Sequence, residues 1–194
     1  MLIVPQWLSP ENKDHRIPVI LDPGMIFGTG AHASTQMCLG ALEQLVQPGD
    51  TVLDLGSGSG ILSIAALRLG AAHATGVDID PKAEDIAREN AAMNGLGSAV
   101  FTALTGDVLS DGQMVQQLGA TQSDLVLANI VADVIIPLSQ VVPQLLKPTG
   151  PFLCSGVLKT RLPEVEAALC AAGLAITGRR EQQDWCCLTA KRRI

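Results

Sequence analysis

Asp54 and the three glycines that follow it in the sequence are the residues of this chain best suited to bind a ligand. A hydrophobic run ends at Asp54 and is followed by Gly56, Gly58 and Gly60, within the segment VLDLGSGSG. Glycine at a strand-to-helix turn lets the backbone approach a ligand closely. The acidic residue two positions before the first glycine suits a nucleoside with a cationic amino-acid tail, whose ammonium Asp54 would face. The alternative is a strand–turn–helix that merely needs glycine.

The same segment argues against a nicotinamide dinucleotide. The fingerprint for that cofactor is G-x-G-x-x-G/A, which needs a small residue at position 61. Ile61 stands there instead. A nicotinamide-dependent oxidoreductase is therefore a disfavoured alternative.

A second carboxylate ends the next hydrophobic segment, GVDID. Asp78 lies 22 residues after Gly56, close to the spacing of about 20 residues at which a carboxylate binds ribose hydroxyls. Its two acceptor oxygens suit a diol. Asp80 is expected to cap the helix that opens at Pro81. The alternative for Asp78 is a helix cap with no ligand.

The third and fourth predicted strands end near Asp107 and at Asn129. Ligands of open α/β sheets lie beyond the carboxyl ends of the strands, so Asn129 is expected to project into the same crevice as Asp78. Asp107 is expected to accept from the exocyclic amine of an adenine, or to be an ordinary loop carboxylate. Asn129 offers a donor and an acceptor that can orient an amine, or it forms a turn.

Strands that alternate with helices must position these residues. Residues 1–22 are expected to be an irregular, linker-like lead-in, and residues 23–194 one domain. Strands are predicted at 51–56, 73–80, 98–107, 123–130, 150–157, 174–181 and 184–191, and helices at 35–46, 59–70, 81–95, 134–146 and 161–173. This order predicts an α/β fold with a doubly wound, mostly parallel seven-stranded sheet. The last two strands should form an antiparallel hairpin.

Composition excludes several classes of protein. The net charge is −6 and the only dense basic run is KRR, so direct binding of duplex nucleic acid is not expected. No apolar run reaches the roughly 18 residues of a membrane helix. The first residues lack the basic segment of a signal peptide, so the expected location is the cytoplasm. The five cysteines form no CxxC pair and are expected to be reduced packing residues, with no metal site.

The glycine-rich stretch LDPGMIFGTGAHAST precedes the first predicted strand of the sheet, unlike a phosphate-binding loop. The G-x-G-x-G loop, Asp78 and the polar tip of the fourth strand together resemble class I S-adenosylmethionine-dependent methyltransferases. With FGTG-H--T, GVDIDPKA, NIVA and LLKPTG, the chain is similar to the bacterial ribosomal protein L11 methyltransferase family (PrmA) from about residue 2 to residue 190.

The resemblance implies roles for individual residues. Thr35, Gly56, Asp78 and Asn129 match the S-adenosylmethionine-binding positions of the family; Asp54, Gly58, Gly60 and Asp107 complete our candidate cofactor site. The loop of Phe27, Gly28, Thr29 and Gly30 would fold over the cofactor, and together with Asn129 it forms our candidate methyl-transfer site. The segment NIVA, residues 129–132, would line the target amine. Members of the family methylate lysine ε-amines and an N-terminal α-amine, so the resemblance implies a protein substrate, expected to be a basic ribosomal protein.

The chain departs from the family pattern in three places. Full-length members carry a separate N-terminal domain that recognises the ribosomal protein, whereas this chain begins in what would be the linker. AHAST replaces the usual THPTT, and Ser57 replaces a more usual Cys. We expect His32 to order the loop rather than act as a base, because methyl transfer mainly needs an aligned lone pair. Trp7 and Trp185 are expected to be packing residues.

Three readings of function remain open at this stage. The first is methyl transfer to amines of a ribosomal protein. The second keeps the cofactor but changes the acceptor to another protein lysine or a small molecule. The third is a non-catalytic module that binds the cofactor and senses or scaffolds.

Overall fold

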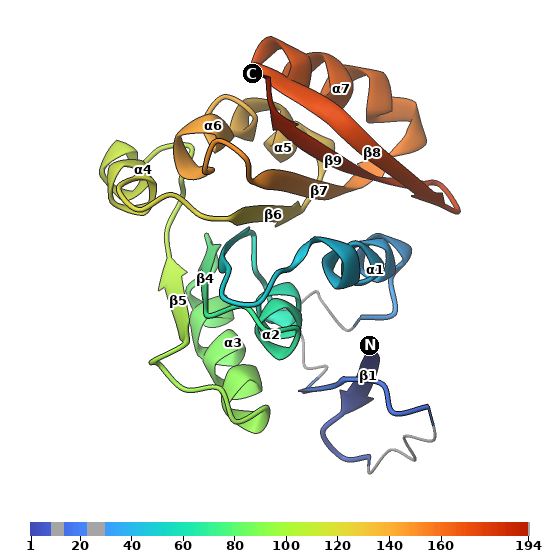
Figure 1. Ribbon diagram of the computed structural model, residues 1–194, viewed down its shortest axis with the longest axis vertical. Helices are drawn as coiled ribbons and strands as arrows, with labels where there is room; N and C mark the ends of the chain where they lie inside the picture. Colours follow the sequence, from blue (N-terminus) through green and yellow to red (C-terminus); the bar gives the residue numbers. More distant parts are fainter. Residues whose placement is uncertain (9–13, 23–29, 194) are drawn as a thin grey trace.

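An open seven-stranded sheet forms the centre of the computed structural model, which describes residues 1–8, 14–22 and 30–193 (Figure 1). Its strands are β3 (Thr51–Leu55), β4 (His73–Asp78), β5 (Phe101–Thr105), β6 (Leu125–Asn129), β7 (Pro151–Leu158), β8 (Leu174–Gln182) and β9 (Trp185–Arg192). Their order is β5-β4-β3-β6-β7-β9-β8. Only β9 runs opposite to the other six strands. The predicted mostly parallel sheet with a C-terminal hairpin is confirmed.

Helices cover both faces of this sheet (Figure 1). One face carries α1 (Ala33–Leu45), α2 (Ile61–Arg68) and α3 (Pro81–Met93). The other carries α4 (Gly112–Gly119), α5 (Ala132–Leu138), α6 (Val142–Leu145) and α7 (Leu162–Ala171), which follows the 3₁₀ turn η1 (Lys159–Arg161). In the described part of the chain, no helix combines the length and the apolarity needed to cross a bilayer.

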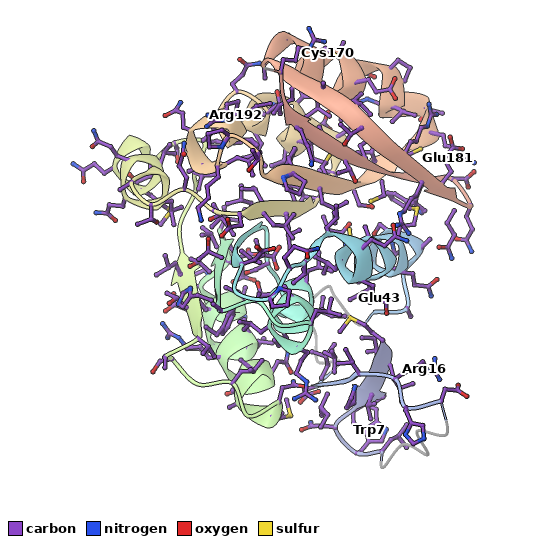
Figure 2. All side chains as sticks on the ribbon, viewed as in Figure 1. Trp7, Arg16, Glu43, Cys170, Glu181 and Arg192 are labelled. Carbon is purple, nitrogen blue, oxygen red and sulfur yellow. The ribbon has the colours of Figure 1, made fainter. Side chains whose placement is uncertain are left out.

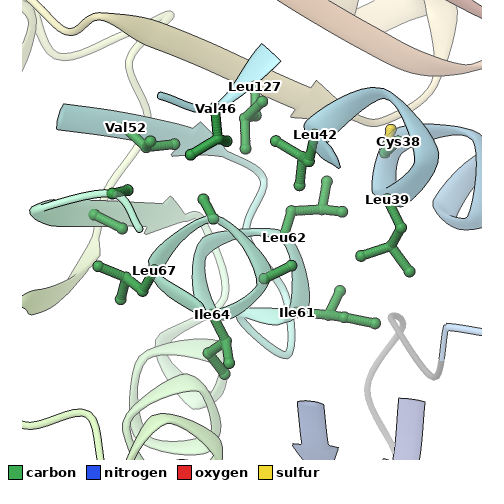
Figure 3. Packing of buried hydrophobic residues seen from close by; sticks show 14 of the residues in the cluster. Cys38, Leu39, Leu42, Val46, Val52, Ile61, Leu62, Ile64, Leu67 and Leu127 are labelled. Atoms are coloured by element: carbon green, nitrogen blue, oxygen red, sulfur yellow. The ribbon is translucent and has the colours of Figure 1, made fainter. Parts of the chain in front are cut away.

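The two faces have separate hydrophobic cores, because successive strand side chains point to opposite sides of the sheet. Val52 belongs to one core, and the next residue, Leu53, to the other. In the first core Val52 packs with Leu42 of α1 and Leu62 of α2 (Figure 3). Each fully buried leucine contributes roughly 1.5–3 kcal/mol, so this core fixes both helices against the centre of the sheet.

The central strands β3 and β6 are adjacent, but the chain leaves them in opposite directions. From β3 it passes through α2 to β4 on one side, and from β6 it passes through α5 and α6 to β7 on the other. Such a reversal of direction opens a crevice at the carboxyl ends of the two strands. The fold therefore predicts where a ligand site lies.

The lead-in of residues 1–22 is more ordered than expected. β1 (Leu2–Pro5) and β2 (Pro18–Leu21) pair as a separate parallel sheet. Val19 and Leu21 are buried in the first core. The prediction of an irregular lead-in is wrong for these segments, because each strand is only four residues long and has a proline at one end, which obscured the strand pattern. The division into a lead-in and a domain at residue 23 stays a prediction.

Two other elements differ from the sequence-based prediction. The helix expected over 134–146 is two helices, α5 and α6, since Pro143 lacks an N–H and its ring opposes a continuous helix at Ser139. Helix α4 was not predicted. Its start is marked by Asp111, whose side chain accepts hydrogen bonds from the N–H groups of Gln113 and Met114.

The cysteines agree with their prediction as reduced packing residues. All five are free, and all but the half-buried Cys170 are buried. Burial raises the pKa of the Cys154 thiol far above its ordinary value, which keeps it protonated.

The Asn90 side chain joins three segments of the molecule. It is fully buried on α3. Its Oδ1 accepts from the N–H of Asp22 (2.8 Å), and its Nδ2 donates to the carbonyl of Ser59 (2.9 Å). One amide therefore connects the lead-in and the glycine turn to the same helix. One turn later, Asn94 bonds both backbone groups of Ile20 in the same way.

We expect Asn90→Ala to lower the free energy of unfolding by about 2–4 kcal/mol, because two backbone groups lose their partners. Chemical denaturation of variant and wild type measures this difference. Glu89→Ala, at an exposed position on the same helix, is the control and should change stability by less than about 0.5 kcal/mol. Equal losses in both variants would contradict the role of Asn90.

Candidate functional site

A cavity of about 1040 Å³ opens at the carboxyl ends of the parallel strands. It is lined from the tips of β3, β4, β5, β6 and β7, from the start of α1 and from the start of β9. Six of the predicted site residues that end strands or follow them lie on it, as does Thr35 of α1: Thr35, Asp54, Gly56, Gly58, Asp78, Asp107 and Asn129. The structure thus brings together residues that are up to 94 positions apart.

Asp54 is a buried carboxylate with one oxygen left over. Its side chain is 1% exposed. Oδ2 accepts from the N–H (3.2 Å) and the hydroxyl (2.9 Å) of Ser63. Oδ1 has no hydrogen-bond partner among the described residues. Burial raises the pKa of Asp54 from 3.8 to about 6. Because a buried acceptor without a partner is costly, this oxygen is suited to a cationic donor from a ligand in the cavity.

Gly56 occupies a position where a side chain does not fit. Its φ is +75°, and a Cβ there would lie 2.5 Å from Cγ2 of Ile130. Its N–H donates to the carbonyl of Val77 (2.8 Å), which ties the turn to β4. Gly56 is half-buried and lines the cavity, and without a side chain its backbone is open to close approach by a ligand there.

Gly60 and Gly30 have packing roles in the structure and do not line the cavity. A Cβ on Gly60 would lie 3.0 Å from Cβ of Ala87, so this glycine allows α2 to approach α3. A Cβ on Gly30 would meet the side chains of Ile3 and Ile61 at 3.0–3.2 Å. The other candidate residues of that loop, Phe27, Gly28 and Thr29, lie outside the described residues.

Asp78 holds the glycine turn in shape. Its Oδ2 accepts from the N–H of Gly58 (2.9 Å), and its Oδ1 accepts from the N–H of Asp80 (3.0 Å). Each oxygen keeps a further lone pair, so the carboxylate can accept from a diol as well. Asp80 caps α3 through the N–H of Lys82, as predicted.

Asp107 serves its own loop. Its Oδ1 accepts from the N–H of Leu109 (2.9 Å), and its Oδ2 accepts from the hydroxyl of Ser110 (2.8 Å). These bonds form the turn that leads into α4. Both readings of Asp107 stay open, since it also lines the cavity, but the loop role is the one that the contacts favour.

Asn129 is oriented by Thr35. Its Nδ2 donates to Oγ1 of Thr35 at 3.1 Å, and Thr35 is 3% exposed. The bond holds the amide nitrogen toward Thr35 of α1 and leaves Oδ1 available as an acceptor on a residue that lines the cavity. A neutral acceptor held in this way can orient an amine without charging it.

His32 orders the start of α1, as predicted. Its Nδ1 accepts from the N–H of Ser34 (3.2 Å) as the cap of the helix. Its ring meets that of Trp185 edge-on, with centroids 4.7 Å apart. The helix begins at Ala33 rather than at Thr35, since His32 takes the capping position that a serine or aspartate usually holds.

Ile79, Leu109 and Val134 are apolar lining residues that the sequence analysis did not predict, whereas Val131 belongs to the predicted segment 129–132. Ile79 is 73% exposed, and Val131 is 57% exposed on the same cavity, with Leu109 and Val134 beside them in the lining. The available signal was position: Ile79 directly follows Asp78, and Leu109 and Val131 lie two residues after Asp107 and Asn129. Of the segment 129–132, Ala132 is buried and does not line the cavity.

The packing role predicted for both tryptophans holds for Trp185 and not for Trp7. Trp185 packs on the first core and also lines the cavity. Trp7 is 66% exposed, so the packing role is wrong for it. It lies near β1, at the end of the molecule away from Glu181 of the hairpin (Figure 2).

Comparison with known proteins gives a family match over the whole site. The model of the family described as ribosomal protein L11 methyltransferase (PrmA) matches residues 1–193. The ribosomal protein L11 methyltransferase of Symbiobacterium thermophilum is 43% identical over 190 residues, which cover 98% of this chain and 59% of that protein. The chain thus spans about three-fifths of the length of such curated relatives.

Solved structures agree on the fold. The ribosomal protein L11 methylase from Lactobacillus delbrueckii subsp. bulgaricus is similar with a TM-score of 0.83 and 34% identity, over 99% of this chain and 94% of that one. A TehB-like SAM-dependent methyltransferase from Corynebacterium glutamicum reaches 0.63 at 15% identity, over 80% and 88%, and shows the fold alone. The predicted class I methyltransferase fold is confirmed.

Asp54 should make the unliganded protein less stable as the pH rises. Its folded pKa of about 6 lies above the ordinary 3.8, so the folded state binds more protons between these values and stability falls through that window. The loss should reach about 3 kcal/mol at neutral pH.

Denaturation of wild type and Asp54→Asn from about pH 4 to pH 8 measures this effect, because the amide keeps the shape without the ionisation. The variant should gain stability relative to wild type as the pH rises, and the gain should level off above about pH 7. A difference that does not depend on pH would contradict the assignment.

Proposed function

Because the chain belongs to the ribosomal protein L11 methyltransferase (PrmA) family, we propose that it transfers methyl groups from S-adenosylmethionine to amines of ribosomal protein L11. The observation that carries this proposal is the buried, unpartnered Oδ1 of Asp54, a residue that lines the cavity. It fits the ammonium of the methionine part of the cofactor, and a buried ionised carboxylate is stabilised by an opposite charge.

The residues beside Asp54 fit the nucleoside of the same cofactor. Gly56 presents backbone without a side chain. Asp78 offers free lone pairs for the ribose hydroxyls. The exposed side chain of Ile79 follows directly and offers an apolar surface for the adenine ring. The acidic, glycine-rich and apolar parts of one cavity thus match the three parts of one ligand.

Asn129 is the residue that we assign to the acceptor. S-adenosylmethionine supplies a methyl group that its sulfonium makes electrophilic, so the protein mainly provides proximity and orientation. Oδ1 of Asn129 would accept an N–H of a neutral amine and fix the direction of its lone pair. Thr35 keeps that oxygen in place through the bond to Nδ2.

The names of the relatives and the net charge of this chain both support a protein as the acceptor. The relatives named above act, by their names, on ribosomal protein L11. A net charge of −6 favours association with a basic protein. We further propose that the acceptors are lysine ε-amines or an N-terminal α-amine, and that the reaction occurs in the cytoplasm, where ribosomal proteins are made.

We expect wild-type protein to bind S-adenosylmethionine in calorimetry, and Asp78→Ala to weaken binding by more than about tenfold, since it removes the acceptor for the ribose and frees the glycine turn. Asp85→Ala, on an exposed part of α3 outside the cavity, should bind like wild type. A wild type without affinity for the cofactor would refute the proposed function.

Asn129→Ala should lower kcat for methylation of ribosomal protein L11 by about tenfold or more, the equivalent of one oriented hydrogen bond in the transition state. Mass spectrometry of the acceptor over time gives the rate. Thr35→Val, which removes only the hydroxyl, should give a smaller loss. Tight cofactor binding with no methylation of any acceptor would instead support the non-catalytic alternative.

A further inference from the structure

The cavity has two chemically different halves. Its carboxylates, Asp54, Asp78, Asp80 and Asp107, all come from the tips of β3, β4 and β5. The half lined from β6, β7, β9 and α1 has none among the described lining residues. The nearby Asp133 of α5 is paired with Arg161 at 2.8 Å. One half is thus acidic and the other uncharged and largely apolar.

Trp185 reaches the uncharged half because β9 is antiparallel. It is the first residue of β9 and pairs with Leu158 at the carboxyl end of β7. An antiparallel strand begins at the edge of the sheet where its parallel neighbours end. The indole is therefore brought to the same edge as Asn129, 56 residues earlier in the chain, and both side chains line the cavity.

The position of the indole is fixed relative to Asn129. Its ring packs against that of His32 at an interplanar angle of 71°. His32 caps the helix whose Thr35 holds Asn129. Ser155 of β7 donates to the carbonyl of Ser34 at 3.2 Å, which ties this turn to the sheet. A continuous set of contacts thus runs from Trp185 to the amide.

We propose that Trp185, supported by His32, is a specificity-determining residue that binds the alkyl chain of a lysine acceptor and directs its ε-amine to Asn129. This inference rests on the proposed function. An aromatic wall is suited to a flexible methylene chain, because it buries apolar area without charging the site. Val131 and Val134 extend the same apolar lining. An N-terminal α-amine, by contrast, is attached directly to the backbone and has no methylene chain to pack against this aromatic wall.

The test uses purified ribosomal protein L11 as acceptor, S-adenosylmethionine as cofactor, and the variants Trp185→Ala and Trp185→Phe. In Trp185→Ala, KM for the acceptor should rise by about tenfold and the ratio of lysine to α-amine methylation should fall. Cofactor affinity should stay within about twofold of wild type. Trp185→Phe should restore most of the lost KM, because it keeps an aromatic ring. Mass spectrometry assigns each methylated amine.

Unchanged acceptor KM and site ratio in Trp185→Ala would overturn the proposal. A parallel fall in cofactor affinity, kcat and melting temperature in both variants would overturn it too, since that pattern marks a purely structural residue. Absence of methylation by the wild type would instead refute the proposed function.

A binding measurement tests the role of Trp185 even if the wild type methylates nothing. The chain has two tryptophans, so Trp7→Phe leaves Trp185 as the only indole. The substitution changes only an exposed side chain. Titration with ribosomal protein L11 in the presence of S-adenosylhomocysteine should change the fluorescence of this variant saturably. An unchanged emission spectrum, with association shown by an independent method, would overturn the proposal.

Discussion

The close approach of β3 and β6 at their carboxyl ends is the constraint on which the site depends. Gly56 lies so near Ile130 that even one extra carbon atom does not fit. The strands can therefore stay paired up to the point where the chain turns away in opposite directions, and the crevice opens directly above the turn. Asp54, just before that turn, is buried by the same packing, which raises its pKa and leaves one oxygen without a partner.

Much of the fold and part of the site were predictable from the sequence because their causes are local. Alternation of apolar strands and capped helices predicts the sheet. The glycine turn and Asp78 predict the part of the cavity that we assign to the cofactor. The strands of the lead-in were missed, because they pair with each other and pack on a core formed by residues far away in the sequence. The break before Pro143 depends on how the proline ring meets the preceding helical turn. The spacing of apolar residues does not predict that contact.

The part of the cavity that we assign to the acceptor was harder to predict, because it is assembled from long-range contacts. Asn129 was found from its place at a strand end, but the hydrogen bond that orients it comes from Thr35, 94 residues away. Trp185 looked like a packing residue, and it does pack. Its place on the cavity follows from the direction of β9 in the sheet, which depends on strand order rather than on neighbouring residues.

The position of β9 also has a consequence for how the molecule is made. β8 precedes β9 in the chain, yet β9 lies between β7 and β8 in the sheet. While the chain emerges in order of synthesis, β7 presents an unpaired edge and β8 has no strand to join. The sheet closes only when residues 185–192 insert between them. The half of the cavity to which β9 contributes Trp185 is therefore complete only once β9 has paired with β7.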